Sequence, residues 1–408
     1  MPILSIFKST VLLLVLVLSS CREQQKKENP EVATVQTEPV PEIKVAANRT
    51  EVYLPLLQGK KVGVVANQTS VIFNDKGHVH LVDSLLSLGV DVKQAFAPEH
   101  GFRGEADAGE HVTDGIDAKT GLPIISLYGK NRKPSKEQLD QLDVMVFDIQ
   151  DVGVRFYTYI ATLQLVMEAC AEYNTPIIVL DRPNPNGHYV DGPTMMKEHK
   201  SYLGLNPIPL VYGMTIGEYA KMLNGENWLE VGRKADLTVI TLENYTHESD
   251  YHLPIRPSPN LPSDVAITLY PSLGLFEGTN VNAGRGTEFQ FQRYGASFMD
   301  STKYDFSYVP APNFGSKTPK EDGKTCYGKD LSKMERMNEV SVQWVMDAYN
   351  NTLDKSKFFL TSGFTKHAGT PLLQQQIEQG LSEAEIKATW QDDLTAFKKI
   401  REKYLIYD

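Results

Sequence analysis

Between residues 61 and 181, short apolar runs alternate with longer segments in which apolar residues recur every three or four positions. The runs at 144–147 and 177–180 contain no polar residue, which is typical of strands buried on both faces of a parallel sheet. The intervening segments predict amphipathic helices, one of which opens at Ser135 with a capping pattern. The sequence predicts strands near 61–66, 92–97, 123–128, 144–148 and 176–181.

This alternation predicts an α/β fold with a Rossmann-like, doubly wound parallel sheet. Residues 215–223 and 237–240 add a further helix and a further strand. Three prolines within 256–262 are incompatible with a helix or a central strand, so we expect a domain boundary there. The prediction is a Rossmann-like domain over 52–262 and a second, smaller α+β domain over 263–408 that completes a cleft.

The C-terminal part predicts helices rather than further parallel strands. Its apolar periodicity places helices near 337–352, 371–379 and 382–406, with Trp344 and its neighbours Met346 and Tyr349 in the core. A chain of 408 residues is long enough for two cores, since one domain usually holds about 100–200 residues.

The N-terminus has the pattern of a signal peptide. One early lysine precedes the apolar run at 11–18, which is well short of the roughly 20 residues that cross a bilayer. The segment Leu18-Ser19-Ser20-Cys21 resembles a bacterial lipobox, which implies cleavage before Cys21 and lipid attachment to its thiol. We therefore expect a lipoprotein signal peptide over 1–21, with an ordinary secretory signal peptide as the alternative. The expected location is the cell envelope, facing the periplasm or on the outer membrane.

Residues 22–51 are polar and rich in Glu, Gln and Pro, which predicts a flexible tether. Apart from Cys21, the chain has only Cys170 and Cys326, so a disulfide framework is not expected. Cys170 lies on the apolar face of a predicted helix and is expected to fill the core.

The charge of the chain argues against a nucleic-acid partner. The 41 basic residues are interleaved with 51 acidic residues, the net charge is −10, and no basic stretch stands out. A nicotinamide or flavin cofactor is not expected either, because Asn67-Gln68-Thr69-Ser70 follows the first strand in place of the glycine-rich dinucleotide motif. The sequence thus predicts neither a cofactor nor a metal.

Polar residues follow the predicted strands where each strand ends. They are Asn67 after the first strand, Glu99 after the second, Asp148 after the fourth, and Asp181 with Arg182 after the fifth. The carboxyl ends of parallel strands meet at one edge of a sheet, and ligands bind at that edge. We therefore expect these residues to converge there.

Two loops at this edge carry the strongest chemical signal. Residues 97–104 place Glu99, His100 and Arg103 in an irregular, glycine-containing loop; the alternative is a surface turn with a solvated Glu. Residues 148–159 combine acids, Arg155 and phenols, a mixture suited to a saccharide. The alternative for this second loop is that Asp151 and Arg155 pair with each other to fix its shape.

A third polar stretch at 275–288 belongs to the C-terminal part. Its glycines would let the backbone approach a ligand, while Glu277, Arg285 and Glu288 supply charge; the alternative is a hairpin with solvated ends. The turn-rich segment at 181–187 is interpreted as a rigid rim.

The chain contains no serine elbow, nucleophilic cysteine motif or H-E-x-x-H helix, so hydrolysis by paired carboxyls is the simplest interpretation. Glycosidic cleavage requires one protonated carboxyl and a second group that acts on the sugar or on water. Sequence does not measure the separation of the two.

Four separated motifs resemble the NamZ-type exo-β-N-acetylmuramidase family, and the likeness runs from about residue 52 to the C-terminus. They are GVVANQTS at 63–70, PEHGFRG at 98–104, DIQDVGVR at 148–155 and SPN at 258–260. The resemblance implies a two-domain glycoside hydrolase with a Rossmann-like N-terminal domain. It also implies removal of N-acetylmuramic acid from the non-reducing ends of peptidoglycan fragments during cell-wall recycling.

Carried onto this sequence, the resemblance implies that Glu99 is the catalytic general acid. Asp148 is favoured as the second catalytic group, while Asp151, Glu277, Glu288 and the substrate's own acetamido oxygen stay open as alternatives. One arginine among Arg103, Arg155 and Arg285 is expected to bind the lactyl carboxylate. The full set of expected substrate contacts is Asn67, His100, Arg103, Asp151, Arg155, Tyr157, Asn260, Glu277 and Arg285.

Two other functional classes remain open at this point. A metal-dependent hydrolase would draw on residues such as His100, His111, Glu105, Asp148 and Asp151, although these lack a standard ligand spacing. A lipid-anchored protein that binds muramyl saccharides without cleaving them is also compatible with two α/β domains around a cleft.

Overall fold

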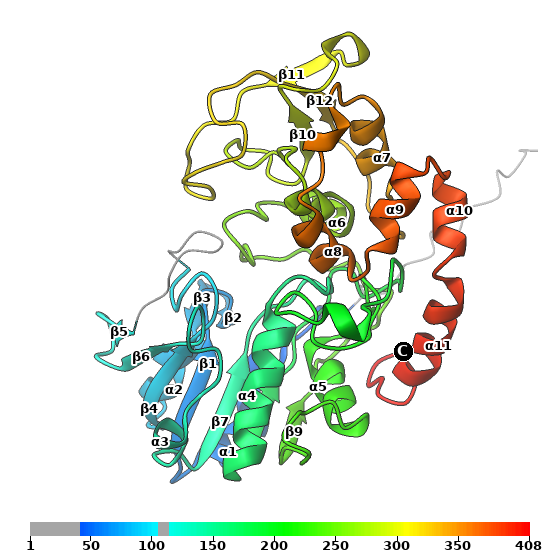
Figure 1. Cartoon of the computed structure of the whole chain (residues 1–408). Coiled ribbons are helices and arrows are strands. Elements are labelled where there is room, and N and C mark those ends of the chain that lie inside the picture. The colour runs from blue at the N-terminus through cyan, green and yellow to red at the C-terminus, as the bar shows by residue number, and fades with distance from the viewer. Residues whose placement is uncertain (1–40, 105–113) are drawn as a thin grey trace, which may run out of the picture. The chain divides into compact units, whose positions relative to one another are not determined.

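A parallel sheet forms the N-terminal part of the protein, as the apolar runs predict. The computed structural model describes residues 41–104 and 114–408 (Figure 1), and within them the main sheet has the order β5-β6-β4-β1-β7-β8-β9. All neighbouring strands pair in parallel except β5, which runs antiparallel to β6. The strands are β1 (Lys61–Ala66), β4 (Asp91–Ala97), β5 (Gly115–Ile116), β6 (Pro123–Ser126), β7 (Val144–Asp148), β8 (Ile177–Leu180) and β9 (Leu237–Ile240).

When the short edge strand β5 is left out, six parallel strands remain. If they are numbered by their order in the chain, their spatial order in the sheet is 3-2-1-4-5-6. This is the order of a Rossmann-type doubly wound sheet, so the predicted fold class is confirmed. The chain moves outwards from β1 through β4 to β6, and then returns to place β7 on the other side of β1. The winding direction therefore reverses between β1 and β7, the position where such sheets bind ligands.

The central strands are buried on both faces. Every residue of β7 and β8 is buried. Phe147 and Val179 belong to one hydrophobic cluster, whereas the adjacent Val146 and Ile178 belong to another. The period of two in a strand sends successive side chains to opposite faces, and this explains the unbroken apolar runs in the sequence.

Helices cover this sheet, and side-chain caps define where several of them begin. Ser135 and Gln138 form the predicted capping box, and Thr215 and Glu218 form a second one. Cys170 is buried in α4, and burial raises the pKa of its thiol to about 12, which fits the predicted core role. The helices of this part are α1 (Thr50–Leu57), α2 (Leu81–Ser87), α3 (Lys136–Leu139), α4 (Tyr159–Tyr173) and α5 (Ile216–Gly225); a hairpin of β2 (Val71–Asn74) and β3 (Gly77–His80) precedes α2.

The C-terminal part contains a small antiparallel sheet, of order β10-β12-β11, and a set of short helices. The single helix predicted over 382–406 is wrong, because two helices occupy it. The Thr389 hydroxyl donates to the Ile386 carbonyl, and buried Trp390 then starts the next helix. The elements are α6 (Asp264–Leu273), β10 (Arg293–Ala296), β11 (Phe306–Tyr308), β12 (Cys326–Asp330), α7 (Gln343–Asn350), α8 (Thr361–Ala368), α9 (Leu372–Glu378), α10 (Glu383–Ala388) and α11 (Gln391–Arg401).

The last residues of the chain return to the parallel sheet (Figure 1). The Arg401 guanidinium donates to the Gly213 carbonyl at 2.7 Å, and the Tyr407 hydroxyl donates to the Asp181 carboxyl at 2.6 Å. Residues 42–408 accordingly form one compact unit. The predicted division at residue 262 stays a prediction.

The folded unit begins before the end of the predicted tether. Val45, Ala46 and Ala47 are buried, and Lys44 pairs with Glu243 in a short backbone bridge. These residues therefore belong to the fold and not to the tether predicted over 22–51. The predicted signal peptide, Cys21 and most of that tether lie outside the described residues. Within the described ranges, no helix combines the length and apolarity needed to cross a membrane.

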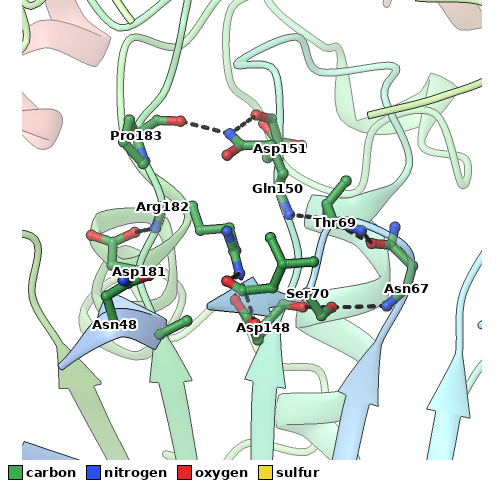
Figure 2. A network of polar contacts seen from close by, with 12 residues as sticks. Asn48, Asn67, Thr69, Ser70, Asp148, Gln150, Asp151, Asp181, Arg182 and Pro183 are labelled. Atoms are coloured by element: carbon green, nitrogen blue, oxygen red, sulfur yellow. Dashed lines mark hydrogen bonds and ion pairs between the residues drawn. The ribbon is translucent and has the colours of Figure 1, made fainter. Parts of the chain in front are cut away.

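A buried ion pair ties the ends of β7 and β8 together (Figure 2). The Arg182 Nε and Nη2 atoms donate to the two carboxylate oxygens of Asp148 at 2.6 and 2.8 Å, and Nη2 also donates to the Val71 carbonyl. The two side chains are 3% and 0% exposed. Burial raises the pKa of Asp148, and the Arg182 guanidinium opposes that rise. The pair thus joins three segments at the point where the sheet reverses.

We expect Arg182→Met to lower the free energy of unfolding by about 3–5 kcal/mol, because it leaves the Asp148 carboxylate buried without its cation. Urea denaturation followed by circular dichroism measures the change. Lys136→Met is the matched control: it breaks the exposed pair with Asp140, and the cost should be about 1 kcal/mol or less. Equal losses in the two variants would contradict a structural role for the buried pair.

Candidate functional site

Two loops that leave neighbouring strands bring Glu99 and Tyr128 together. Glu99 follows β4 by two residues, and Tyr128 follows β6 by two residues. Because these strands pair in parallel, their carboxyl ends meet at one edge. The Tyr128 hydroxyl donates to Glu99 Oε1 at 2.9 Å.

Thr158 supplies a second hydroxyl to the same carboxyl. It lies at the N-cap position of α4, at the end of the loop after β7, and its Oγ1 donates to Glu99 Oε2 at 2.7 Å. A hydroxyl can donate or accept a hydrogen bond. Tyr128 and Thr158 thus each hold one oxygen of the Glu99 carboxyl.

Arg103 does not take the role that the sequence suggests. Its guanidinium contacts Asp117 at 3.0 and 2.7 Å and Asp83 at 3.2 Å. The hydrogen bonds from Arg103 lower the pKa of Asp117 to about 2. Arg103 thus fixes the loop to α2 and is absent from the cavity wall described next, so its predicted contact with the substrate stays a prediction without support from the cavity.

A cavity of about 540 Å³ lies beside Glu99. This volume falls within the range of small-molecule sites, about 300–1,000 Å³. Both parts of the chain contribute to the wall: Glu99, His100 and Thr158 come from the sheet loops, whereas Glu277 and Arg285 come from the C-terminal part. Of the predicted site residues, the structure brings to this cavity Glu99, His100, Tyr157, Asn260, Glu277 and Arg285.

Glu277 is the second carboxyl of the cavity. Its Oε2 atom lies 3.1 Å from Arg285 Nη1, and the two side chains are 24% and 20% exposed. Burial raises the pKa of Glu277, but the positive charges of Arg285 and Lys320 together outweigh it, so the pKa lies below its usual value. Lys320 is held in place by donating to the carbonyls of Phe276, Glu277 and Thr279. Glu277 is therefore a carboxylate in the neutral pH range.

Aromatic rings form the apolar part of the wall. Phe156 packs edge-on against Tyr270, whose ring packs in turn against Phe291. The pKa of Tyr270 is raised well above its usual value by burial and then by the charges of Glu277 and Glu99. The Tyr270 phenol therefore lies within electrostatic reach of both carboxyls.

Sequence reasoning missed a group of cavity residues. Arg132 places its guanidinium 4.2 Å from the centre of the Tyr202 ring, and Lys366 and His367 enter from α8. Burial lowers the pKa of His367, so its imidazole is neutral at neutral pH. These residues belong to no motif with a known spacing, and folding alone brings them to Glu99. The missed residues include Tyr128, Arg132, Thr158, Tyr202, Ser258, Tyr270, Lys366 and His367.

Asp148 does not reach the cavity. It is fully buried and bound to Arg182 on both oxygens, and it is not among the cavity residues. A carboxylate in this setting has no contact with a ligand. The prediction that Asp148 is the second catalytic group is therefore wrong, and its position at a strand end reflects a structural role.

Asn67 is likewise buried in the edge of the sheet. Its Oδ1 atom accepts from the backbone nitrogen and the hydroxyl of Thr69, at 2.8 and 2.6 Å (Figure 2). The Thr69 hydroxyl also accepts from the backbone of Gln150 at 3.0 Å. Asn67 thus shapes the turn after β1 and is not part of the cavity wall, contrary to its predicted contact with substrate.

Asp151 and Arg155 are both buried, and each has partners other than its neighbour. Asp151 accepts from the Gly153 nitrogen at 2.6 Å and from the Tyr212 hydroxyl. Arg155 donates to the carbonyls of Pro193, Ile208 and His367 at 2.7–3.1 Å. Neither residue lines the cavity, so their predicted substrate contacts stay predictions that the cavity does not support, and their hydrogen bonds go to other partners than each other.

The predicted metal-dependent alternative depends partly on Glu105 and His111, which lie outside the described residues. Across residues 41–104 and 114–408, no group of three or more His, Cys, Asp or Glu side chains is placed to hold a metal ion. The structure therefore adds nothing in support of a metal centre.

Two family models match the chain. A family model described as "Exo-beta-N-acetylmuramidase NamZ, N-terminal" matches residues 62–265, and its C-terminal counterpart matches residues 268–407. The chain is 40% identical over 375 residues to "Peptidoglycan beta-N-acetylmuramidase NamZ" of Bacillus subtilis (strain 168). That alignment covers 87% of this chain and 89% of the relative.

Two crystal structures of DUF1343 family proteins from Bacteroides fragilis NCTC 9343 have a similar fold. One is 44% identical with a TM-score of 0.83, and the match covers 90% of this chain and 99% of that one. The other is 28% identical with a TM-score of 0.75, with coverage of 90% and 100%.

The buried Asp151 generates a prediction on pH dependence. Burial raises its pKa to about 7, whereas an unfolded Asp titrates near pH 4. Between these values the folded protein holds a proton that the unfolded chain has released, so stability falls as the pH rises. Asp151→Asn removes this proton uptake while keeping an oxygen for Tyr212 and Gly153.

We therefore expect the stability of Asp151→Asn relative to the parent to increase from pH 4 to pH 7, by about 4 kcal/mol at most, and to level off above pH 7. Urea denaturation at pH 4.5, 6 and 8 measures the difference. The pKa of Asp181 is also raised to about 7 by burial, but that residue is present in both proteins and cancels. Parallel pH curves for the two proteins would contradict the assignment.

Proposed function

This chain belongs to the NamZ family of exo-β-N-acetylmuramidases, and we infer that it hydrolyses the glycosidic bond of non-reducing terminal N-acetylmuramic acid in peptidoglycan fragments. It is thus a glycoside hydrolase of peptidoglycan turnover. Its substrate is a saccharide such as N-acetylmuramic acid linked to N-acetylglucosamine.

The observation that carries the proposal on the site is that Glu99 and Glu277 line one cavity in contrasting settings. Glu277 lies beside Arg285 and Lys320, whose charges keep it ionised. The Glu99 carboxyl, in contrast, accepts hydrogen bonds from the hydroxyls of Tyr128 and Thr158. Glycosidic cleavage uses such a pair, one group as acid and the other as carboxylate.

We assign the role of general acid to Glu99 on this basis. It protonates the oxygen of the leaving sugar as the glycosidic bond breaks. Glu277 then serves as the carboxylate that activates water or stabilises the positive charge that develops on the sugar ring. This assignment replaces Asp148 by Glu277 as the second group.

The cations of the cavity suit the lactyl carboxylate of N-acetylmuramic acid. Of the three arginines considered from sequence, only Arg285 lines the cavity, and Arg132 and Lys366 join it there. Arg285 is already beside Glu277, whereas Arg132 stacks on Tyr202. A guanidinium can bind a carboxylate with two parallel hydrogen bonds, and Arg132 lies over a ring in the cavity wall.

We expect Glu99→Gln and Glu277→Gln each to lose about a hundredfold or more in kcat, since general acid–base groups contribute about 10²–10⁴-fold. The assay follows release of N-acetylmuramic acid from its disaccharide with N-acetylglucosamine, or of nitrophenol from the para-nitrophenyl β-glycoside. Glu288→Gln is the matched control, because Glu288 lies near Arg285 in sequence but is exposed and does not line the cavity.

An active Glu99→Gln variant would make Glu99 a structural residue. If the parent binds the saccharide but releases no sugar, the hydrolase assignment fails and a saccharide-binding protein remains.

For localisation, we propose that the mature chain is held in the cell envelope by a lipid on Cys21. The apolar run at 11–18 and the sequence Leu18-Ser19-Ser20-Cys21 support this proposal. Cys21→Ala is expected to abolish incorporation of labelled palmitate and to move the protein from the membrane fraction to the soluble fraction. Ser5→Ala, upstream of the lipobox, is the control. Unchanged fractionation of the Cys21 variant would overturn the proposal.

A further inference from the structure

The side chain of Asn260 lines the cavity with both of its polar atoms unused. The residue is 3% exposed, and among the described residues neither Oδ1 nor Nδ2 has a hydrogen-bond partner. A buried donor or acceptor without a partner is costly to a fold. Asn260 leaves one acceptor, Oδ1, and one donor, Nδ2, without a partner beside the cavity. It is therefore suited to a ligand that supplies one donor and one acceptor.

The turn that carries Asn260 is held firmly from behind. The Pro257 carbonyl accepts from the Tyr157 hydroxyl at 2.7 Å and from Gln68 Nε2 at 3.1 Å, and the Asn260 nitrogen donates to Ser258 Oγ at 3.1 Å. These bonds fix the backbone on both sides of Pro259. The amide is therefore positioned before a ligand arrives.

Gly315 packs directly against this amide. A Cβ atom at Gly315 would lie 2.9 Å from Asn260 Oδ1, closer than side chains tolerate. A side chain at this position would therefore displace the amide, and the glycine preserves its position. The amide of Asn260 is thus closely packed from this side as well.

A pyranose offers an amide one arrangement that uses both atoms at once: two neighbouring ring substituents, one donating and one accepting. In terminal N-acetylmuramic acid, the free 4-hydroxyl donates and the adjacent O3, an ether oxygen that carries the lactyl group, accepts. Inside a glycan strand the 4-oxygen is glycosidic and has no hydrogen. The Asn260 Oδ1 atom would then face the glycosidic oxygen, which is also an acceptor. This unfavourable contact would disfavour the binding of N-acetylmuramic acid units inside a glycan strand.

We propose that Asn260 recognises the non-reducing end of the substrate, with Oδ1 accepting from the free 4-hydroxyl and Nδ2 donating to O3 of terminal N-acetylmuramic acid. This inference rests on the proposed function and deepens it, because it assigns exo specificity to one residue. Asn260 binds the sugar edge remote from the bond that is cleaved.

The test compares the para-nitrophenyl β-glycoside of N-acetylmuramic acid with its 4-deoxy analogue, which removes the hydroxyl without adding bulk. We expect the parent to prefer the 4-hydroxy substrate at least about tenfold in kcat/KM, the effect of one buried group left unpaired. In Asn260→Ala and in the similarly sized Asn260→Leu, the preference should fall below about threefold. A structural role would lower kcat/KM for both substrates equally and leave their ratio unchanged.

A 2-deoxy analogue, which lacks the acetamido group, tests the other sugar edge. If the Asn260 variants lose discrimination at the 2-position and keep it at the 4-position, the proposal is overturned in favour of acetamido recognition. Gln290→Leu is the matched control: it removes another buried amide next to Gly315, one that does not line the cavity, and should leave both ratios unchanged.

Failure of the inference and failure of the proposed function have different signatures. If the parent hydrolyses the 4-hydroxy and the 4-deoxy substrate equally well, the inference is overturned although the proposed function holds. This outcome is measured on the parent alone and does not depend on whether a variant folds. If the parent hydrolyses neither substrate, calorimetric binding of N-acetylmuramic acid and its 4-deoxy form to the parent and to Asn260→Ala still tests the contact. Equal affinities of the parent for the two sugars would overturn it.

Discussion

The buried pair of Asp148 and Arg182 is the interaction on which the edge of the sheet depends. β7 and β8 are buried on both faces, so polar groups at their ends have little water to contact and must find partners within the protein. Arg182 meets this requirement for Asp148 and also binds the Val71 carbonyl. The ends of two central strands and the start of the β2 hairpin are thereby fixed together, and the loops that build the cavity leave from this fixed edge.

The polar residues at the strand ends therefore divide into two classes. Those after β1, β7 and β8, such as Asn67 and Asp148, bind one another or the backbone (Figure 2). Those after β4 and β6, Glu99 and Tyr128, bind each other and line the cavity. The first class lies after the three adjacent strands β1, β7 and β8, and the second lies after β4 and β6. The loop after β7 joins both classes, because it begins at Asp148 and ends at Thr158, which donates to Glu99.

The sequence predicts the sheet well because short runs made only of apolar residues are typical of strands that are buried on both faces of a sheet. It also identifies Glu99 and Glu277, since charges flanked by apolar residues and glycines are unusual. It does not separate Glu99 from Asp148, because both are acids directly after a strand and only burial distinguishes them. His367 and Arg132 could not be predicted, since their approach to Glu99 depends on the packing of α8 and of the loop after β6.

Hydrogen-bond satisfaction distinguishes the buried pair of Asp148 and Arg182 from the buried amide of Asn260. Asp148 and Arg182 bind each other directly, and neither lines the cavity. Asn260 is equally buried, yet both atoms of its amide lack a partner among the described residues, and it does line the cavity. A fold gains stability by satisfying a buried amide and gains nothing from leaving it unsatisfied. The open amide is thus best explained by a ligand that completes it, and a sugar edge with one donor and one acceptor has the required complementarity.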